Sequence, residues 1–372
     1  MYYFDHNATT PVSSEVLEAM LPLMTEVYGN ASSIHHFGQA ARQKLDAARR
    51  QVAAMVGAAA EEIVFTSGGT EADNLALIGT GGHAITTAVE HPAVLASCAQ
   101  LASVTRVEVD SRGVVDPGAI RRALRPDTKI ISVMHVNNEL GVIQPIAEIA
   151  RIAREAGVVM HSDGVQAAGK IPVNVAELGV DLYSISGHKF YAPKGVGALY
   201  VRKGTRLSPT MHGGHHERDR RAGTENVPGA AGLGRAAQWM IDQGPAEWAR
   251  LQALRDRLET GILERVPDSH VNGAGAPRTP NTSNIRFDGI DGEPLLIALD
   301  LRGFAVSSGS ACSSGAQEPS HVLTAIGLSR EQAKSSLRFS LGRANDAAQV
   351  DALIDAVAAS VEHLRKLAPA YA

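Results

Sequence analysis

The fold is decided by the stretch Ile146-Ala-Glu-Ile-Ala-Arg-Ile-Ala-Arg-Glu-Ala-Gly-Val-Val-Met-His161. Residues 146–156 place isoleucines and alanines on one face at helical spacing, and Gly157 follows as a helix stop signal. Residues 158–161 are then a short apolar run, which is typical of a buried strand. A helix followed at once by a buried strand is the unit from which parallel sheets are built.

The same alternation of helices and strands extends in both directions from this unit. Buried strands are predicted at residues 62–66, 84–89, 106–109, 130–134, 158–161, 181–185 and 197–201. This alternation predicts an α/β fold with a mostly parallel sheet flanked by helices. Ligands of such sheets bind beyond the carboxyl ends of the strands, so the candidate site residues are sought there.

The regular alternation of strands and helices ends at about residue 230. A charged amphipathic helix is predicted over 247–266, short strands over 284–287, 304–306 and 336–340, and a final helix over 346–366. We therefore predict a large domain over residues 13–245. A smaller α+β domain is predicted to combine residues 1–12 with residues 246–372.

Composition narrows the functional classes. The chain has 372 residues with a formal net charge of −4 and 4% aromatic residues, so neither a nucleic acid nor an anionic membrane is expected as a partner. No apolar run is long enough for a transmembrane helix, and the N-terminus does not read as a signal peptide. The two cysteines, Cys98 and Cys312, do not form a disulfide framework and favour the reducing cytoplasm.

Three features at strand ends could carry chemistry. The strand 62–66 runs into Ser67-Gly-Gly-Thr-Glu71, a turn whose backbone N–H groups could hold an anion at a helix N-terminus. Asp163 follows the strand 158–161, and Lys189 follows the strand 181–185. Taken singly, each is more often structural: a tight turn, a turn aspartate that bonds its own backbone, and a solvated surface lysine. Together they suit pyridoxal phosphate, which needs an anion site, an acid at the ring nitrogen and a lysine for its aldehyde.

The chain resembles the cysteine desulfurases of the IscS/NifS type, in the class V aminotransferase family. That family implies the type I fold of pyridoxal-phosphate-dependent transferases. The matching motifs follow one another along nearly the whole chain and include Asp5-His-Asn-Ala-Thr-Thr-Pro11, Glu62-Ile-Val-Phe-Thr-Ser-Gly-Gly-Thr-Glu71, Glu90-His-Pro92, Val136-Asn-Asn-Glu-Leu-Gly-Val-Ile-Gln-Pro145, Ser186-Gly-His-Lys-Phe-Tyr191, Pro193-Lys-Gly-Val-Gly197, Gly223-Thr-Glu-Asn226 and Arg338-Phe-Ser-Leu-Gly-Arg343.

The resemblance implies a role for each matching residue. Lys189 would bind the cofactor aldehyde as a Schiff base, and His91 would stack on the ring and act in acid–base catalysis. The other implied cofactor contacts are Asp163 at the ring nitrogen, Gln166 at the ring hydroxyl, Asn138 beside the ring, Gly69, Thr70, Ser186 and His188 at the phosphate, and Thr224 at the phosphate of a second subunit. The implied substrate contacts are Asn7, Asn138 and Arg338, with Arg338 at the carboxylate, although an arginine there could also form a surface salt bridge.

Cys312 lies among small residues in Ser307-Ser-Gly-Ser-Ala-Cys-Ser-Ser-Gly315, a setting unlike that of a packed cysteine. The resemblance makes it the nucleophile that takes sulfur from L-cysteine as a persulfide and releases L-alanine. It also implies a homodimer and a sulfur-accepting protein, such as an iron–sulfur scaffold or a tRNA-thiolation enzyme. Cys312 could be a transient iron–sulfur ligand, whereas Cys98 is expected to be a packing residue.

Alternative functions remain open at this point. Selenocysteine lyase or another class V aminotransferase activity is compatible with the motifs, although Cys312 argues against an aminotransferase. A non-catalytic sulfur-assembly partner is disfavoured, because Lys189, Asp163 and His91 are all present. A dinucleotide-dependent dehydrogenase is excluded, because no Gly-x-Gly-x-x-Gly follows the first strand. His212, His215 and His216 could bind a metal, but we expect no metal site and assign them to a loop near the cofactor. His215, His216 and Asp219, and also His6 and Gly164, depart from the family pattern.

Overall fold

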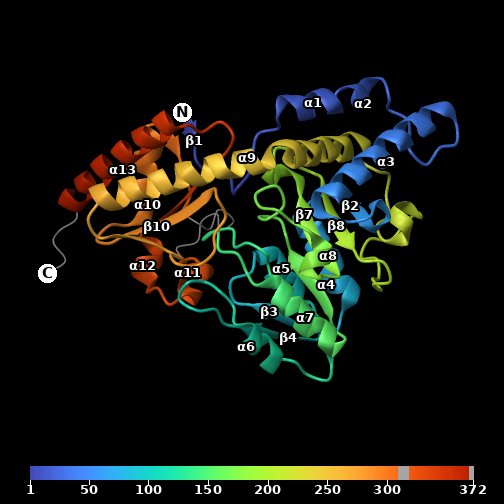
Figure 1. Ribbon diagram of the computed structural model, residues 1–372, viewed down its shortest axis with the longest axis horizontal. Coiled ribbons are helices and arrows are strands. Elements are labelled where there is room, and N and C mark those ends of the chain that lie inside the picture. Colours follow the sequence, from blue (N-terminus) through green and yellow to red (C-terminus); the bar gives the residue numbers. More distant parts are fainter. Residues whose placement is uncertain (309–317, 368–372) are drawn as a thin grey trace.

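The computed structural model describes residues 1–308 and 318–367 (Figure 1). Within these residues the largest sheet has seven strands, in the order β2 (Ile63–Thr66), β8 (Gly197–Val201), β7 (Leu182–Ser186), β6 (Val159–Asp163), β5 (Thr128–Ser132), β3 (His83–Thr87) and β4 (Ser103–Val107). Strands β7, β6, β5, β3 and β4 are parallel, and β8 is antiparallel to both neighbours. The mostly parallel sheet predicted from the sequence is therefore confirmed.

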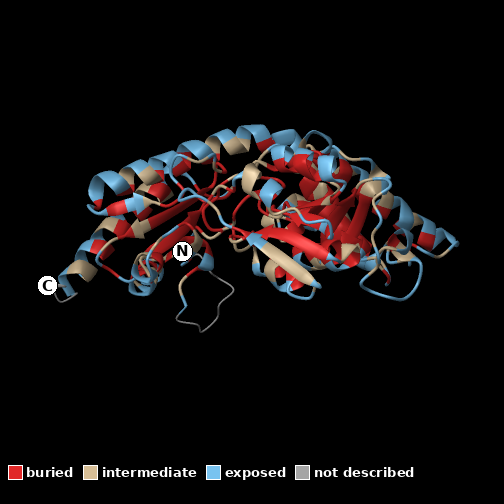
Figure 2. Ribbon diagram, turned by 90° about the horizontal axis from the view of Figure 1, so that it is seen from below, coloured by how far each residue is buried: buried red, intermediate tan, exposed pale blue. Residues whose placement is uncertain are grey.

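Helices cover both faces of this main sheet. The flanking helices are α3 (His36–Val56), α4 (Gly69–Thr80), α5 (Pro92–Cys98), α6 (Pro117–Arg122), α7 (Ile146–Ala156) and α8 (Val175–Leu178). One apolar cluster joins Leu45 of α3 and Ile149 of α7 to the sheet, and another joins Leu75 of α4 and Val94 of α5. Figure 2 shows the buried strands between helices whose outer faces are exposed. Burial on both faces explains why the strands read as apolar runs.

Helix α9 (Val227–Arg265) differs from the sequence prediction, which placed its start at residue 247. Its first half contains several glycines and two prolines, which are poor helix formers. These small residues let α9 pack closely on α3, because a Cβ at Gly234 would lie 2.7 Å from the Ala48 Cα. Tertiary packing thus outweighs local propensity, and α9 runs unbroken through the predicted domain boundary at residues 245–246.

The C-terminal region forms a second group of strands and helices beside the main sheet. Among the described residues, β9 (Ser269–Val271), β10 (Thr282–Phe287) and β12 (Ser336–Ser340) form an antiparallel sheet, and β1 (Tyr2–Tyr3) pairs with β11 (Phe304–Ala305). The helices here are α10 (Gly292–Leu301), α11 (His321–Ala325), α12 (Arg330–Lys334) and α13 (Ala347–Leu367). Phe4 is buried in one cluster with Phe339 and Val357. The N-terminal residues thus pack on the C-terminal region, while the proposed domain limits stay a prediction.

The remaining elements are short helices. They comprise α1 (Ser14–Met20), α2 (Pro22–Thr25) and the 3-10 helices η1 (Ala60–Glu62), η2 (Gly187–Lys189) and η3 (His216–Asp219). Of these, η2 directly follows β7 and carries Lys189 to the carboxyl end of the main sheet. Within the described ranges, no helix is sufficiently long and apolar to cross a membrane.

Candidate active site

The glycine-rich turn lies between β2 and α4, as the sequence predicted. Gly68 precedes the helix, Gly69 is its first residue, and the exposed Thr70 follows. A Cβ at Gly69 would lie 2.6 Å from the Val165 Cγ2, so a larger residue would fill the space beside the turn. The same Cβ would lie 3.4 Å from the Ser186 Cβ. The turn, the segment after β6 and the end of β7 therefore meet at one place.

Asp163 is the last residue of β6 and is 4% exposed. Its Oδ1 accepts a hydrogen bond of 2.9 Å from the backbone N–H of Val165. Burial raises the pKa of this carboxyl group, while His91 and Lys189 oppose that rise. A cationic partner at this carboxylate would offset the cost of its burial.

Lys189 lies in η2 and is half-buried. Its Nζ donates hydrogen bonds to the backbone carbonyl oxygens of Asn7 (2.7 Å) and Ala8 (2.8 Å). The N-terminal segment therefore positions the lysine amine, and the charge of Lys189 acts on both Asp163 and His91. Three of the residues predicted to react or to hold the ring are thus brought together.

His91 is the residue preceding α5, and its Nδ1 accepts a hydrogen bond of 3.1 Å from the backbone N–H of Ala93. That bond leaves the proton of a neutral ring on Nε2. Burial lowers the pKa of His91, against the influence of Asp163. A neutral imidazole beside an acid and a lysine can accept or donate a proton near neutral pH.

Ser186 lies beside the glycine-rich turn, and His188 follows it two residues later in η2. Ser186 ends β7 and is buried, with its Oγ 3.9 Å from a Cβ built at Gly68. His188 Nδ1 lies 3.1 Å from Thr9 Oγ1. Burial, then the charge of Lys189, lowers the pKa of His188 to about 4. A hydroxyl and a neutral imidazole are suitable partners for a phosphate group.

Gln166 forms part of a buried network that the sequence did not reveal. Its Nε2 donates to the Asn7 carbonyl oxygen at 2.9 Å, and its Oε1 accepts from Lys170 Nζ. Lys170 Nζ also donates to Asn7 Oδ1 at 2.8 Å. Burial, followed by the charge of Lys189, holds the pKa of Lys170 well below its usual range. The only sequence signal for Lys170 was its spacing of four residues from Gln166.

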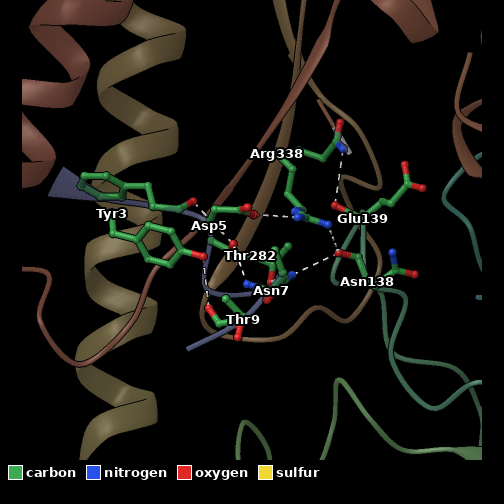
Figure 3. Close-up of polar contacts among 12 residues, drawn as sticks. Tyr3, Asp5, Asn7, Thr9, Asn138, Glu139, Thr282 and Arg338 are labelled. Carbon is green, nitrogen blue, oxygen red and sulfur yellow. Dashed lines mark hydrogen bonds and ion pairs between the residues drawn. The ribbon is translucent and has the colours of Figure 1, made fainter. Parts of the chain in front are cut away.

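Arg338 lies in β12 and is 2% exposed, so the alternative of a surface salt bridge is wrong. Its Nη2 donates to Asp5 Oδ1 at 2.7 Å, and its Nη1 donates to the Asn138 carbonyl oxygen at 3.0 Å (Figure 3). The Asn7 Nδ2 donates to the same carbonyl at 3.1 Å. Asn7, Asn138 and Arg338, which the family resemblance assigned to the substrate, are therefore neighbours. The sequence analysis missed Asp5, although it stands in a matching motif.

Two buried glutamates were also missed. Glu139 Oε2 accepts a hydrogen bond of 2.6 Å from Ser320 Oγ, and burial raises the pKa of Glu139. Glu90 accepts from Met134 N at 3.0 Å, and burial raises its pKa to about 8. His321 Nε2 lies 2.9 Å from the Glu90 carbonyl oxygen. These contacts attach residues 320–321 to the His91 side of the site.

The remaining predicted residues have other locations. Thr224 is exposed in the connection between η3 and α9. His215 Nδ1 lies 2.5 Å from Asp219 Oδ1, and no group of three or more side chains suited to a metal occurs in the described part of the chain. Cys98 is buried in an apolar cluster, which confirms its assignment to packing. Cys312 lies outside the described residues.

Comparisons with known proteins agree with this geometry. The sequence model of the aminotransferase class-V family matches residues 2–353. The chain is 48% identical to the cysteine desulfurase IscS of Dictyoglomus turgidum, over 99% of this chain and 96% of that protein. A NifS-like protein from Rickettsia africae is 34% identical, with a TM-score of 0.91 over 97% of this chain and 99% of that one. SspA in complex with cysteine is 35% identical, with a TM-score of 0.82 over 92% and 99% of the two chains.

Proposed function

The chain belongs to the aminotransferase class-V family, and we propose that it is a cysteine desulfurase that removes sulfur from L-cysteine and releases L-alanine. The observation that carries this proposal is the convergence of Lys189, Asp163 and His91 at the carboxyl ends of parallel strands. The likeness to cysteine desulfurases over almost the full chain supports the same activity.

The residues of the site fit pyridoxal phosphate. The space beside Gly69 and the helix N-terminus suit its phosphate, with Thr70 and Ser186 nearby, and the family resemblance adds His188. Asp163 is a buried acid that lacks a cationic hydrogen-bond partner among the described contacts and would pair with the ring nitrogen. Lys189 would hold the aldehyde, and Gln166 the ring hydroxyl. Bound pyridoxal phosphate supplies an electron sink for the pair released at the substrate Cα.

The chain's own residues bind the substrate and move its protons. Arg338, fixed by Asp5 and Asn138, would receive the carboxylate of L-cysteine through charge-assisted hydrogen bonds. Lys189 Nζ, released when the substrate amine takes its place at the aldehyde, would take the proton from the substrate Cα. His91, whose ring is kept neutral by burial, exchanges a proton with the substrate close to Asp163 and Lys189.

Sulfur transfer is assigned to Cys312. Its thiolate attacks the sulfur of L-cysteine, so that an S–S bond forms as the substrate C–S bond breaks, and protonation completes L-alanine. The persulfide on Cys312 then passes to an acceptor protein, such as an iron–sulfur scaffold or a tRNA-thiolation enzyme. The same thiolate could serve as a transient iron–sulfur ligand.

The two cysteines provide a matched experiment. Cys312→Ala should retain the cofactor absorbance and bind L-cysteine but form neither alanine nor sulfide, whereas Cys98→Ala should keep turnover, because Cys98 is buried in the core. Lys189→Ala should lose the absorbance of the lysine-bound cofactor. Alanine formation by Cys312→Ala at the wild-type rate would rule out the persulfide step.

A homodimer in the cytoplasm is part of the proposal. Thr224 is exposed, as a residue that reaches the phosphate of a second subunit must be. Large apolar side chains are also exposed between residues 12 and 37, among them Leu17, Leu21, Met24 and Phe37. Sedimentation at several protein concentrations tests the dimer. A monomer with full activity would contradict the role of Thr224.

A further inference from the structure

The segment Glu217–Asp219 has an unusual backbone. Its three residues have φ angles of 45°, 57° and 64°, in the left-handed region that non-glycine residues rarely adopt. None of the three is glycine, and Asp219 stands where the family pattern has one. A strained segment persists only when its surroundings hold it, so its contacts indicate what it is for.

A buried ion pair holds this segment. Arg49 of α3 donates from Nη1 to Glu217 Oε2 at 2.6 Å and from Nη2 to Oε1 at 2.7 Å. The two side chains are 6% and 3% exposed. Glu217 Oε2 also accepts a hydrogen bond of 2.9 Å from the backbone N–H of Phe65. Bidentate, charge-assisted bonds of this kind fix a carboxylate in both position and orientation.

The segment and the residues that follow it contact the chain both before and after the glycine-rich turn. Phe65 belongs to β2, which ends just before Ser67. After the turn, Arg221 Nε donates to Glu71 Oε1 at 2.9 Å, and Glu71 Oε2 accepts from the Ser67 N–H at 2.8 Å. A cavity of about 50 Å³ separates the turn from the segment. Its lining includes Thr66, Ser67, Glu217, Arg221 and Gly223.

We propose that Glu217 is a positioning residue for the cofactor phosphate. We call residues 217–221 the brace. Glu217 anchors the brace to β2 just before the glycine-rich turn. Arg221, at the other end of the brace, holds the turn itself through Glu71. The strained backbone is retained because it places Glu217 against Arg49 and Phe65 while Arg221 reaches Glu71. The inference rests on the proposed cofactor site and adds residues that touch neither cofactor nor substrate.

The test compares two ligands that differ only in the phosphate. The full-length chain is stripped of cofactor and titrated with pyridoxal phosphate or with pyridoxal. In Glu217→Gln, the Kd for pyridoxal phosphate should rise about tenfold, the loss expected for one charge-assisted hydrogen bond. The Kd for pyridoxal should stay within about twofold of wild type, because pyridoxal makes no use of the turn.

The chain offers a matched control in the ion pair of Arg278 with Glu259. This pair is also bidentate, at 2.6 and 2.9 Å, with side chains 11% and 13% exposed, and it joins α9 to the segment before β10. Glu259→Gln should lower the stability of the chain without changing the ratio of the two dissociation constants. If Glu217→Gln raised the Kd for pyridoxal phosphate and the Kd for pyridoxal by the same factor, the substitution would have disturbed the whole cofactor site and not the phosphate alone. That result would overturn the proposal.

Two more variants keep the test decisive. If Glu217→Gln does not fold, Arg221→Leu cuts only the second arm of the brace and should raise the Kd for pyridoxal phosphate alone. Asp219→Gly in the Glu217→Gln background should restore part of the lost affinity, since glycine adopts a positive φ without strain; no restoration contradicts the role of strain. A wild-type chain that binds both ligands equally would overturn the proposed phosphate site and the brace with it.

Discussion

Replacing Gly164 with alanine is expected to displace the end of β6 that carries Asp163. A Cβ at Gly164 would lie 2.0 Å from the Cε1 and Cζ of Tyr183 and 2.5 Å from its hydroxyl oxygen, whereas real Cβ contacts are at least 3.0 Å. Tyr183 is fully buried, and its hydroxyl lies 2.8 Å from His135 Nδ1. The ring therefore has no solvent-exposed position to which it can swing.

The structure sets the size of the effect. The backbone or the ring must move by about 1 Å, and overpacking of this kind costs about 1 to 3 kcal/mol. Gly164 N donates to the Ser184 carbonyl oxygen at 3.1 Å, so a backbone shift would strain the β6–β7 pairing beside Asp163. Losing the hydrogen bond between Tyr183 and His135 would add about 1 kcal/mol. We expect Gly164→Ala to lower the free energy of unfolding by about 3 kcal/mol.

Urea unfolding measures this change as a shift of the midpoint at constant slope. Tyr183→Leu removes the clashing ring, so the double variant Gly164→Ala, Tyr183→Leu should be more stable than the sum of the single effects predicts. Additive effects, or a wild-type midpoint for Gly164→Ala, would refute the reasoning. Weaker cofactor binding in Gly164→Ala should accompany the shift, because Asp163 is the adjacent residue.

Three further predictions follow from buried groups. Burial lowers the pKa of His135 to about 4 and that of His161 to about 3, so the unfolded chain binds more protons below pH 6.5. Each ring's contribution to the free energy of unfolding should fall by about 2 kcal/mol between pH 7 and pH 5. It is measured in urea unfolding as the difference between the wild type and a variant without that ring, such as His161→Gln, because Glu90, with its raised pKa, changes the stability of both proteins in the opposite direction; a difference that does not vary with pH would contradict this. Among variants of Lys170, Lys170→Arg should show a lower pH midpoint of the bound-cofactor absorbance than Lys170→Met, because a permanent positive charge beside Lys189 disfavours a second one there; equal midpoints would contradict this coupling. Cys98 is buried and its pKa is raised to about 12, first by burial, so iodoacetamide should label it only after unfolding, as peptide mass spectrometry would show.

Local elements with a clear period were predictable. Helix α7 and strands β8 and β12 match the predicted residues, because apolar spacing and a following glycine are properties of a short window. The first half of α9 was not predictable, because its glycines disfavour a helix until they pack on α3. The left-handed segment Glu217–Asp219 could not be predicted either, because Arg49, a buried residue far away in the chain, stabilises it.

For the candidate site, the sequence by itself determined that Gly69, Asp163 and Lys189 would lie at or just after the ends of strands, because a turn at a strand end is a local property; Asp163 proved to be the last residue of its strand. Only the tertiary structure decided their surroundings. Lys189 is positioned by Ala8, 181 residues away, and Arg338 pairs with Asp5 across 333 residues. Such contacts form only when segments that are far apart in the sequence have folded against each other. Burial then shifts the pKa values of the buried acids and histidines, and burial exists only once the layers have packed.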